Sequence, residues 1–302
     1  PSGYLMHKYR ADGALGSSWH PYVHEGGEPA PPIQEDETAL VLFVFAQYYQ
    51  MHASAKLLTD FYKSMVVPMA DFLASYIDEK TGLPRPSYDL WEEVYLTTTY
   101  TTSVVYAALL AAADLADSAG DADSAVRWRS AADDISSAAH KQLYNQERKA
   151  FYKGIIVRDG TIVRDDTFDL SSVFGAFMFG LFPVGSEQLE SAVATLRQTF
   201  GLAPGTNGLP RYERDTYRRT SDSAPSNWWC ITTLWLAQYD IETGNTDEAR
   251  KLLSWVHDHA GSSGILPEQI NPVTGEFISV APLTWSHSEY VATLLDMINE
   301  NP

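Results

Sequence analysis

The segment GLPRPSYDLWEE, residues 82–93, runs from a Gly-Leu-Pro loop to a tryptophan and two adjacent glutamates. Gly-Leu-Pro-like loops that lead to tryptophans recur at 208–230 and at 264–290. Helix-length segments lie between these loops, so the chain repeats an inner helix, a short turn, an outer helix and a long loop. Hairpins repeated in this way commonly close into a ring, with the long loops gathered at one end. The repeat therefore predicts an all-α ring of helical hairpins, forming one domain over residues 1–302.

Two kinds of helix follow from the pattern of apolar residues. Helices that are apolar around most of their circumference lie inside a protein, and amphipathic helices lie at its surface. The expected inner helices span 36–50, 101–120 and 226–244. The expected outer helices span 122–143, 186–200 and 246–261. The apolar segment 172–182 predicts a further short core helix.

Local signals predict one helix cap and one hairpin. Asn245 stands three residues before Glu248, which predicts a capping box at the start of the last outer helix. Strand-like alternation is confined to short pieces such as 150–164, where Asp159-Gly160 predicts the turn of a small β-hairpin.

The composition narrows the range of partners. The chain has 302 residues and a formal net charge of −18, without any basic run. We therefore expect no nucleic acid and no anionic membrane as partner, because phosphate binding needs clustered Lys and Arg. The single cysteine, Cys230, excludes an internal disulfide framework and a cysteine zinc site, and its apolar neighbours predict a buried thiol.

The N-terminal segment bears on location. PSGYLMHKYR has neither an initiator Met nor the apolar core of a signal peptide, so we expect that upstream residues have been removed. No run reaches the roughly 18 unbroken apolar residues of a membrane span. A single thiol and the lack of a leader favour a cytoplasmic location over a secreted one, and the oligomeric state stays open.

The predicted loops combine aromatic rings with charged groups. The aromatic residues are Trp19, Tyr88, Trp91, Tyr212, Tyr217, Trp228, Trp229 and Trp285. The charged residues are Asp36, Arg85, Asp89, Glu92, Glu93, Arg211, Glu213, Asp215 and Glu268. Rings can cover the apolar face of a pyranose while charged groups hydrogen-bond its hydroxyls. The loops therefore predict a sugar site, whose partner would be an oligosaccharide or a polysaccharide.

Two carboxyl groups are required to hydrolyse a glycosidic bond. The sequence predicts that Glu92 and Glu93 stand at a helix start, about 100° apart, so that only one can reach a given bond. Packing against Trp91 and a neighbouring carboxylate would raise the pKa of the acid, whereas the helix N-terminus would lower it. Glu268, in the third Gly-Leu-Pro-like loop, is the expected partner.

The motifs LWEEV, GLPRYERDTY followed by NWW, and LPEQINP followed by LTWSHSEY resemble the catalytic domain of glucoamylases, glycoside hydrolase family fifteen. The resemblance runs in order from about residue 13 to the C-terminus. It implies an (α/α) toroid of six hairpins and inverting, exo-acting release of glucose from α-glucan ends. It implies Glu92 as general acid, Glu268 as general base and Glu93 as a substrate contact.

The resemblance also implies further binding residues. Arg211 is expected on a glucose hydroxyl, with Tyr212 beside it, and Trp229 matches the aromatic residue after the family's N-P-W. This chain reads Asn227-Trp228-Trp229, so it lacks that proline and its local loop shape differs. The family's Q-x-D matches Gln34 and Asp36. The remaining aromatic residues expected at the sugar site are Trp19, Trp91 and Trp285.

Two departures from the family concern the N-terminus. Family members carry an earlier segment whose Arg-Asp pair grips the terminal glucose, and prokaryotic members carry an upstream β-sandwich. Neither occurs in these residues. We therefore expect a fragment of the toroid that lacks its first helices.

Several alternatives stay open. Within the family these are trehalase, glucodextranase and isomaltose-type hydrolases, because loop residues set the linkage. A non-catalytic carbohydrate-binding toroid is a different class. DDTFD at 165–169 fits the D-D-x-x-D motif of magnesium-dependent terpene and prenyl synthases, although Asp166 or Asp169 also suits a helix cap.

Metal and cofactor motifs are not expected. His257 and His259 would point about 200° apart on a helix and cannot share an ion. We expect His20, His24 and His287 to serve as hydrogen-bonding or packing residues. Hydrolysis by a carboxylate pair needs no cofactor.

Overall fold

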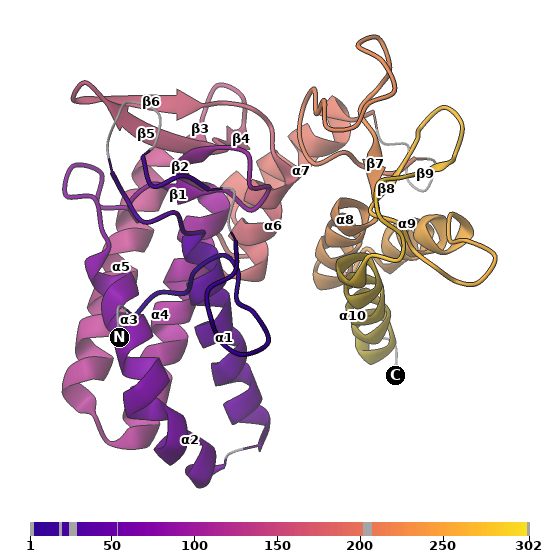
Figure 1. Ribbon diagram of the computed structural model, residues 1–302. Helices are drawn as coiled ribbons and strands as arrows, with labels where there is room; N and C mark the ends of the chain where they lie inside the picture. Colours follow the sequence, from indigo (N-terminus) through magenta and orange to yellow (C-terminus); the bar gives the residue numbers. More distant parts are fainter. Residues whose placement is uncertain (1–2, 18–19, 24–28, 53, 202–206, 301–302) are drawn as a thin grey trace. The chain divides into compact units, whose positions relative to one another are not determined.

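A computed structural model describes residues 3–17, 20–23, 29–52, 54–201 and 207–300 (Figure 1). The chain divides into two compact units. The first unit comprises Pro1–Asn145, Tyr152–Asp166 and Met178–Leu181; the second comprises Gln146–Phe151, Thr167–Phe177 and Phe182–Pro302. The prediction of one domain over residues 1–302 stays a prediction.

The first unit is a helical layer built around α4. Its helices are α1 (Glu35–His52), α2 (Ala55–Phe61), the π-helical turn η1 (Tyr62–Val66), α3 (Val67–Ser75), α4 (Thr99–Ala119) and α5 (Ala122–Gln142). α4 packs against both α1 and α5, so it is an inner helix as predicted. Gly120 adopts the left-handed conformation that ends α4, and the Asp121 side chain then caps α5 by accepting from the Ser124 N–H.

Helix α4 is long and apolar enough to cross a membrane by length and composition alone. Of its most apolar 18-residue window, 61% is buried inside the protein, and the core helix of a soluble protein passes the same test. The packing of α4 between α1 and α5 accounts for its apolar character.

A four-stranded antiparallel sheet lies at one end of these helices (Figure 1). Its strands, in spatial order, are β1 (Ser87–Tyr88), β2 (Tyr95–Thr98), β5 (Gly154–Arg158) and β6 (Thr161–Asp165). The predicted hairpin is confirmed: Arg158 pairs with Thr161, and the turn residues Asp159 and Gly160 both have positive φ, as a two-residue hairpin turn of the primed type requires. Two further short strands are β3 (Tyr144–Asn145) and β4 (Ala150–Phe151).

The second unit packs helices around α8. Its helices are α6 (Leu170–Met178), α7 (Glu187–Thr199), α8 (Cys230–Glu242), α9 (Thr246–Asp258) and α10 (Thr284–Glu300). Residues 230–241 of α8 are all buried, and α8 contacts both α9 and α10, which confirms the predicted inner helix. A three-stranded antiparallel sheet in the order β7 (Trp228–Trp229), β8 (Gln269–Ile270), β9 (Phe277–Ile278) belongs to this unit.

Three local predictions need correction. Asn245 is the N-cap of α9, but its side chain makes no capping hydrogen bond and instead donates to Thr243 Oγ1, so no capping box forms. The helix expected over 36–50 was predicted to be buried on most sides, yet Val44 is 56% and Tyr48 52% exposed on α1, because α1 packs mainly against α4 within the first unit. The third correction concerns Glu92 and Glu93, which stand in a turn and not at a helix start.

Gly154 allows β5 to approach β2 closely. A Cβ at this position would lie 2.4 Å from the Thr97 carbonyl oxygen and 2.6 Å from Leu96 Cδ1. Gly154→Ala should therefore lower the free energy of unfolding by about 1–3 kcal/mol, the usual cost of overpacking. Chemical denaturation measures this. Gly261→Ala is the control, because its Cβ would make only an ordinary contact of 3.4 Å with the Phe277 ring. Equal stability of the two variants would contradict the explanation.

Candidate active site

The turn from Asp89 to Val94 joins β1 to β2 and carries the two glutamates. Tyr88 pairs with Tyr95 across the turn, and helix α4 begins only at Thr99. The predicted helix start at Glu92 is therefore wrong: strand pairing closes the chain into a turn before the helix can begin. Glu92 therefore does not stand at the N-terminus of α4.

Glu92 occupies a strained backbone position. Its φ is +61°, a conformation that a residue with a side chain rarely adopts. Its N–H donates to the Asp89 carbonyl oxygen at 2.8 Å. The Asp89 carboxylate accepts from the N–H groups of Glu93 at 2.7 Å and Val94 at 3.0 Å. These bonds fix the turn and hold the Glu92 side chain 35% exposed.

A buried ion pair anchors this turn to the sheet. Asp89 Oδ2 lies 3.1 Å from Lys153 Nζ, and the two side chains are only 2% and 6% exposed. Lys153 immediately precedes β5, and its N–H donates to the Asp165 carbonyl oxygen. The position of Glu92 is thus coupled to the central strands of the sheet.

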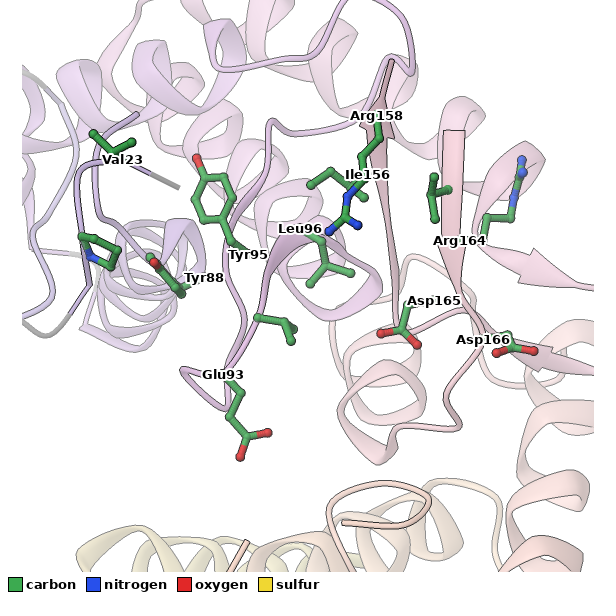
Figure 2. Close-up of a pocket in the computed structure, with 13 residues that line it drawn as sticks. Val23, Tyr88, Glu93, Tyr95, Leu96, Ile156, Arg158, Arg164, Asp165 and Asp166 are labelled. Carbon is green, nitrogen blue, oxygen red and sulfur yellow. The ribbon is translucent and has the colours of Figure 1, made fainter. Parts of the chain in front are cut away.

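A cavity of about 540 Å³ opens beside this turn. Figure 2 shows Glu93 on the turn, Tyr88 and Tyr95 on the adjoining strands, and Arg158 extending from β5 toward Leu96. The described residues that line the cavity are Pro21, Val23, Tyr88, Glu93, Val94, Tyr95, Leu96, Ile156, Arg158, Val163, Arg164, Asp165 and Asp166. The combination of two tyrosines with carboxylates and arginines has the amphipathic chemistry that a sugar requires. The contribution of the hairpin residues was not foreseen, because only the tertiary pairing of β2 with β5 brings them beside Glu93.

His7, from the N-terminal segment, lies close to Glu92 and contacts a second histidine, His20. His7 Nε2 is 3.8 Å from Glu92 Oε1, and His7 Nδ1 is 3.6 Å from Glu37 Oε1. The edge of the His7 ring contacts His20, which stacks on Tyr88 with ring centroids 3.8 Å apart. Sequence reasoning missed His7, since no motif marks it. His20 has the packing role predicted for it, and His24 lies outside the described residues.

Three consecutive acidic residues begin α1, of which Glu35 and Asp36 are buried and Glu37 is partly exposed. Asp36 is 1% exposed, and its carboxylate accepts from Thr101 Oγ1 at 2.6 Å. Burial and the nearby Asp89 raise its pKa to about 7, against the opposing hydrogen bond. Burial, Asp36 and Glu92 raise the pKa of Glu37 to about 8, and burial raises the pKa of Glu35 well above its usual value. Burial and mutual repulsion thus favour the protonated forms of these carboxyl groups.

The second unit holds the predicted arginine in an aromatic enclosure. Arg211 donates to the Asp215 carboxylate through Nε and Nη2, both at 2.8 Å. The rings of Tyr212, Tyr217 and Trp229 surround its guanidinium, with centroids 5.0, 4.9 and 4.9 Å away. Cation–π contacts and a bidentate ion pair together fix the direction of this buried side chain.

Glu268 lies immediately before β8 in the second unit. Its N–H donates to the Val280 carbonyl oxygen, and its Oε2 accepts from Gln269 Nε2 at 2.9 Å. Gln269 Oε1 in turn accepts from Asn227 Nδ2 at 2.8 Å, so the segment after Arg211 holds the amide that contacts Glu268.

The predicted site residues are divided between the two units. Glu92, Glu93, Trp91 and Asp36 belong to the first unit, and Glu268, Arg211, Tyr212, Trp229 and Trp285 belong to the second. Trp91 is buried, and Trp285, on α10, donates from Nε1 to Glu289 Oε1 at 3.2 Å. Trp19 lies outside the described residues. His287, also on α10, accepts from the Leu266 N–H and thus has the predicted hydrogen-bonding role.

The D-D-x-x-D sequence does not form a metal site of the terpene-synthase kind. Asp165 ends strand β6, and Asp169 precedes α6, where its Oδ1 accepts from the Ser171 N–H and hydroxyl. Asp169 therefore acts as a helix cap, one of the two possibilities considered for this segment. Within the described ranges, no group of three or more His, Cys, Asp or Glu side chains is arranged to hold a metal ion.

A family model described as Glycosyl hydrolases family 15 matches residues 9–243 and 240–295. The chain therefore belongs to glycosyl hydrolase family 15.

Individual relatives agree with this membership. An uncharacterized glycosyl hydrolase of Methanocaldococcus jannaschii is 25% identical over 288 residues, which cover 91% of this chain and 44% of that protein. A glucoamylase of Clostridium sp. is 24% identical over 257 residues, covering 77% and 36%. The chain thus spans less than half the length of these curated relatives.

Solved structures show the same fold. A bacterial glucoamylase complexed with acarbose matches with a TM-score of 0.73 and 22% identity, covering 91% of this chain and 42% of that one. The predicted fold class, an (α/α) toroid of helical hairpins with a small β-hairpin, is confirmed.

Removing Lys153 would take away the cation that lies beside the buried Asp89 carboxylate. Lys153→Met should lower the free energy of unfolding by about 3–5 kcal/mol, the usual cost of breaking a buried ion pair on one side. Arg129→Met is the matched control, because Arg129 is 40% exposed and pairs with Asp114 and Asp117 at the surface. Its loss should cost about 0–1 kcal/mol. Urea denaturation of both variants measures the difference, and a loss of no more than about 1 kcal/mol in Lys153→Met would refute the anchoring role.

The raised pKa of Asp36 makes stability depend on pH. Because its native pKa of about 7 exceeds the ordinary value of 3.8, the native state binds more protons than the unfolded state between these values. The free energy of unfolding should therefore fall as pH rises from about 4 to about 7, and Glu37 extends this fall to about pH 8.

Asp36→Asn should flatten this dependence by on the order of 2 kcal/mol between about pH 4.5 and 8. Denaturation curves at a series of pH values measure it. The exposed Asp134→Asn on α5 serves as control and should leave the pH dependence as it is. An unchanged slope in Asp36→Asn would mean that this carboxyl group does not hold its proton in the native state.

Proposed function

We propose that the chain carries the catalytic region of an inverting, exo-acting glycoside hydrolase that releases glucose from the non-reducing ends of α-glucans. Glu92 is the general acid in this proposal, and Glu268 is the general base. The observation that supports it best is the turn from Asp89 to Val94, which holds Glu92 partly exposed while Glu93 lines the adjoining cavity.

The chemistry of each carboxyl group follows from its role. Glu92 gives its proton to the glycosidic oxygen as the bond from that oxygen to C1 breaks, and Glu268 takes a proton from the water that attacks C1. The water must fit between sugar and base, so inversion requires the two carboxyl groups to lie roughly 6.5–9.5 Å apart. The other members of the proposed substrate site are Glu93, Arg211, Tyr212, Trp229, Trp91, Asp36, Trp285 and Trp19.

Family membership and the relatives support an α-glucan as substrate. One curated relative is named a glucoamylase, and the bacterial glucoamylase among the solved structures is complexed with acarbose. In this chain, Tyr88 and Tyr95 would cover the sugar at the first unit's cavity, where Glu93 would accept a hydrogen bond from a hydroxyl. Arg211 would donate to a glucose hydroxyl in the second unit, with its direction fixed by Asp215.

Product analysis tests the reaction type. We expect β-glucose as the first product from maltose and soluble starch, read by proton NMR within the first minutes of hydrolysis. α-Glucose as first product would indicate retention. Exclusive turnover of trehalose or isomaltose would transfer the assignment to another α-glucosidic hydrolase of the family, and sugar binding without any turnover would indicate a non-catalytic toroid.

The role of Glu92 can be tested by an isosteric substitution. Glu92→Gln cannot donate the proton, so kcat on maltose should fall by roughly 10²–10⁴-fold while binding of glucose is retained. Glu79→Gln, an exposed residue of the first unit, is the control and should keep its kcat. Near-normal hydrolysis by Glu92→Gln would exclude Glu92 as the general acid.

A further inference from the structure

His7 lies in a buried position from which it faces the proposed general acid. Its side chain is 4% exposed, and Nε2 points to Glu92 at 3.8 Å, slightly beyond hydrogen-bond length. Its other nitrogen, Nδ1, lies 2.7 Å from Gln34 Oε1. Nδ1 therefore faces an amide oxygen, with the Glu37 carboxyl group 3.6 Å away, and Nε2 faces the Glu92 carboxyl group.

Gln34 decides which nitrogen carries the proton. Its Nε2 donates to the Asp89 carbonyl oxygen at 3.1 Å, which turns Oε1 toward His7. An amide oxygen can only accept a hydrogen bond, so His7 Nδ1 must be the donor. In the neutral imidazole, Nε2 then presents its lone pair to Glu92. In the protonated ring, Nε2 presents an N–H to the same carboxyl group.

Other described ionisable groups also lie close to His7. Glu37 on α1 lies 3.6 Å from Nδ1, the nitrogen that also faces Gln34, and burial raises its pKa to about 8. His20, from the N-terminal segment, contacts the ring edge and is itself stacked on Tyr88. Asp89 on the turn lies close enough to Asp36 on α1 to raise its pKa. The nearest described carboxyl group facing Nε2 is therefore Glu92.

We propose that His7 is the positioning residue of Glu92 and that the two side chains share one proton. This inference rests on the function proposed above. When Glu92 is protonated, neutral Nε2 accepts from its O–H and directs the carboxyl group. After Glu92 has given its proton to the leaving oxygen, His7 takes up a proton from solvent at Nε2 and passes it to the Glu92 carboxylate, which returns both side chains to their starting state. The base releases one proton to solvent in each turnover, so protons balance.

The test compares substrates that differ in their need for acid. A sugar leaving group must be protonated, whereas the fluoride of α-glucosyl fluoride leaves without protonation. The side-chain amide of the His7→Asn variant can still donate to Gln34, as Nδ1 of His7 does. It has no atom at the position of Nε2. His7→Asn should therefore lower kcat on maltose by about tenfold, a part of the roughly 10²–10⁴-fold that proton transfer contributes. KM for maltose and kcat for α-glucosyl fluoride should stay within about twofold.

The pH profile supplies a second readout. Without His7, the proton is held by a lone carboxyl group, so the alkaline limb of kcat/KM on maltose should move to lower pH. His7→Gln places an amide near Nε2 that cannot take up a proton, so it should show the same shift and serves if His7→Asn does not fold. Equal losses on both substrates, or an alkaline limb at its original pH in the folded variant, would overturn the role of His7.

Glu92→Gln separates this inference from the proposed function. If it loses activity on maltose and keeps activity on the fluoride, Glu92 is the acid and the result for His7 then decides the inference alone. If Glu92→Gln hydrolyses maltose normally, the proposed function fails and the inference fails with it, whatever His7→Asn shows.

Discussion

The buried carboxylate of Asp89 is the interaction on which the first unit's site depends. One oxygen accepts two backbone N–H groups of the turn, and the other pairs with Lys153 beside the central strand β5. A buried ion pair tolerates the loss of neither partner, because the remaining charge is then uncompensated. This constraint keeps Glu92 in a left-handed conformation that would otherwise be unfavourable. The strain is thus sustained by the sheet, not by the turn itself.

The carboxyl groups around this turn form an environment that favours protonated acids. Asp36 and Glu37 lie close to Asp89 and Glu92, and burial together with mutual repulsion raises their pKa. Such environments lower stability as pH rises, and they are common where an enzyme must keep an acid neutral near pH 7. His7 and Gln34 bring a donor and an acceptor into the same cluster. Burial of the acidic cluster is therefore the common cause of the loss of stability at higher pH and of the protonated state that the proposed chemistry needs.

The second unit holds a buried positive charge, the guanidinium of Arg211. Three aromatic rings and the Asp215 carboxylate surround Arg211, and the hydrogen bond from Asn227 to Gln269 fixes the amide that contacts Glu268. Arginine suits this role better than lysine, because its planar, weakly hydrated guanidinium stacks on rings while keeping a bidentate pair. The bridge between Leu209 and Trp229 and the sheet β7-β8-β9 bring the segments of these residues together.

The sequence alone determined the helical class, the inner helices α4 and α8 and the hairpin at Asp159-Gly160, because apolar periodicity and turn residues act over a few neighbouring positions. It also indicated Glu92, Glu93 and Arg211 through local motifs. It could not show that Glu92 lies in a strand turn, because that depends on pairing between Tyr88 and Tyr95 across it. Nor could it find His7 or Lys153, which reach the turn from distant parts of the chain. Tertiary structure decided these contacts, since burial and ion pairing join residues without regard to their distance along the chain.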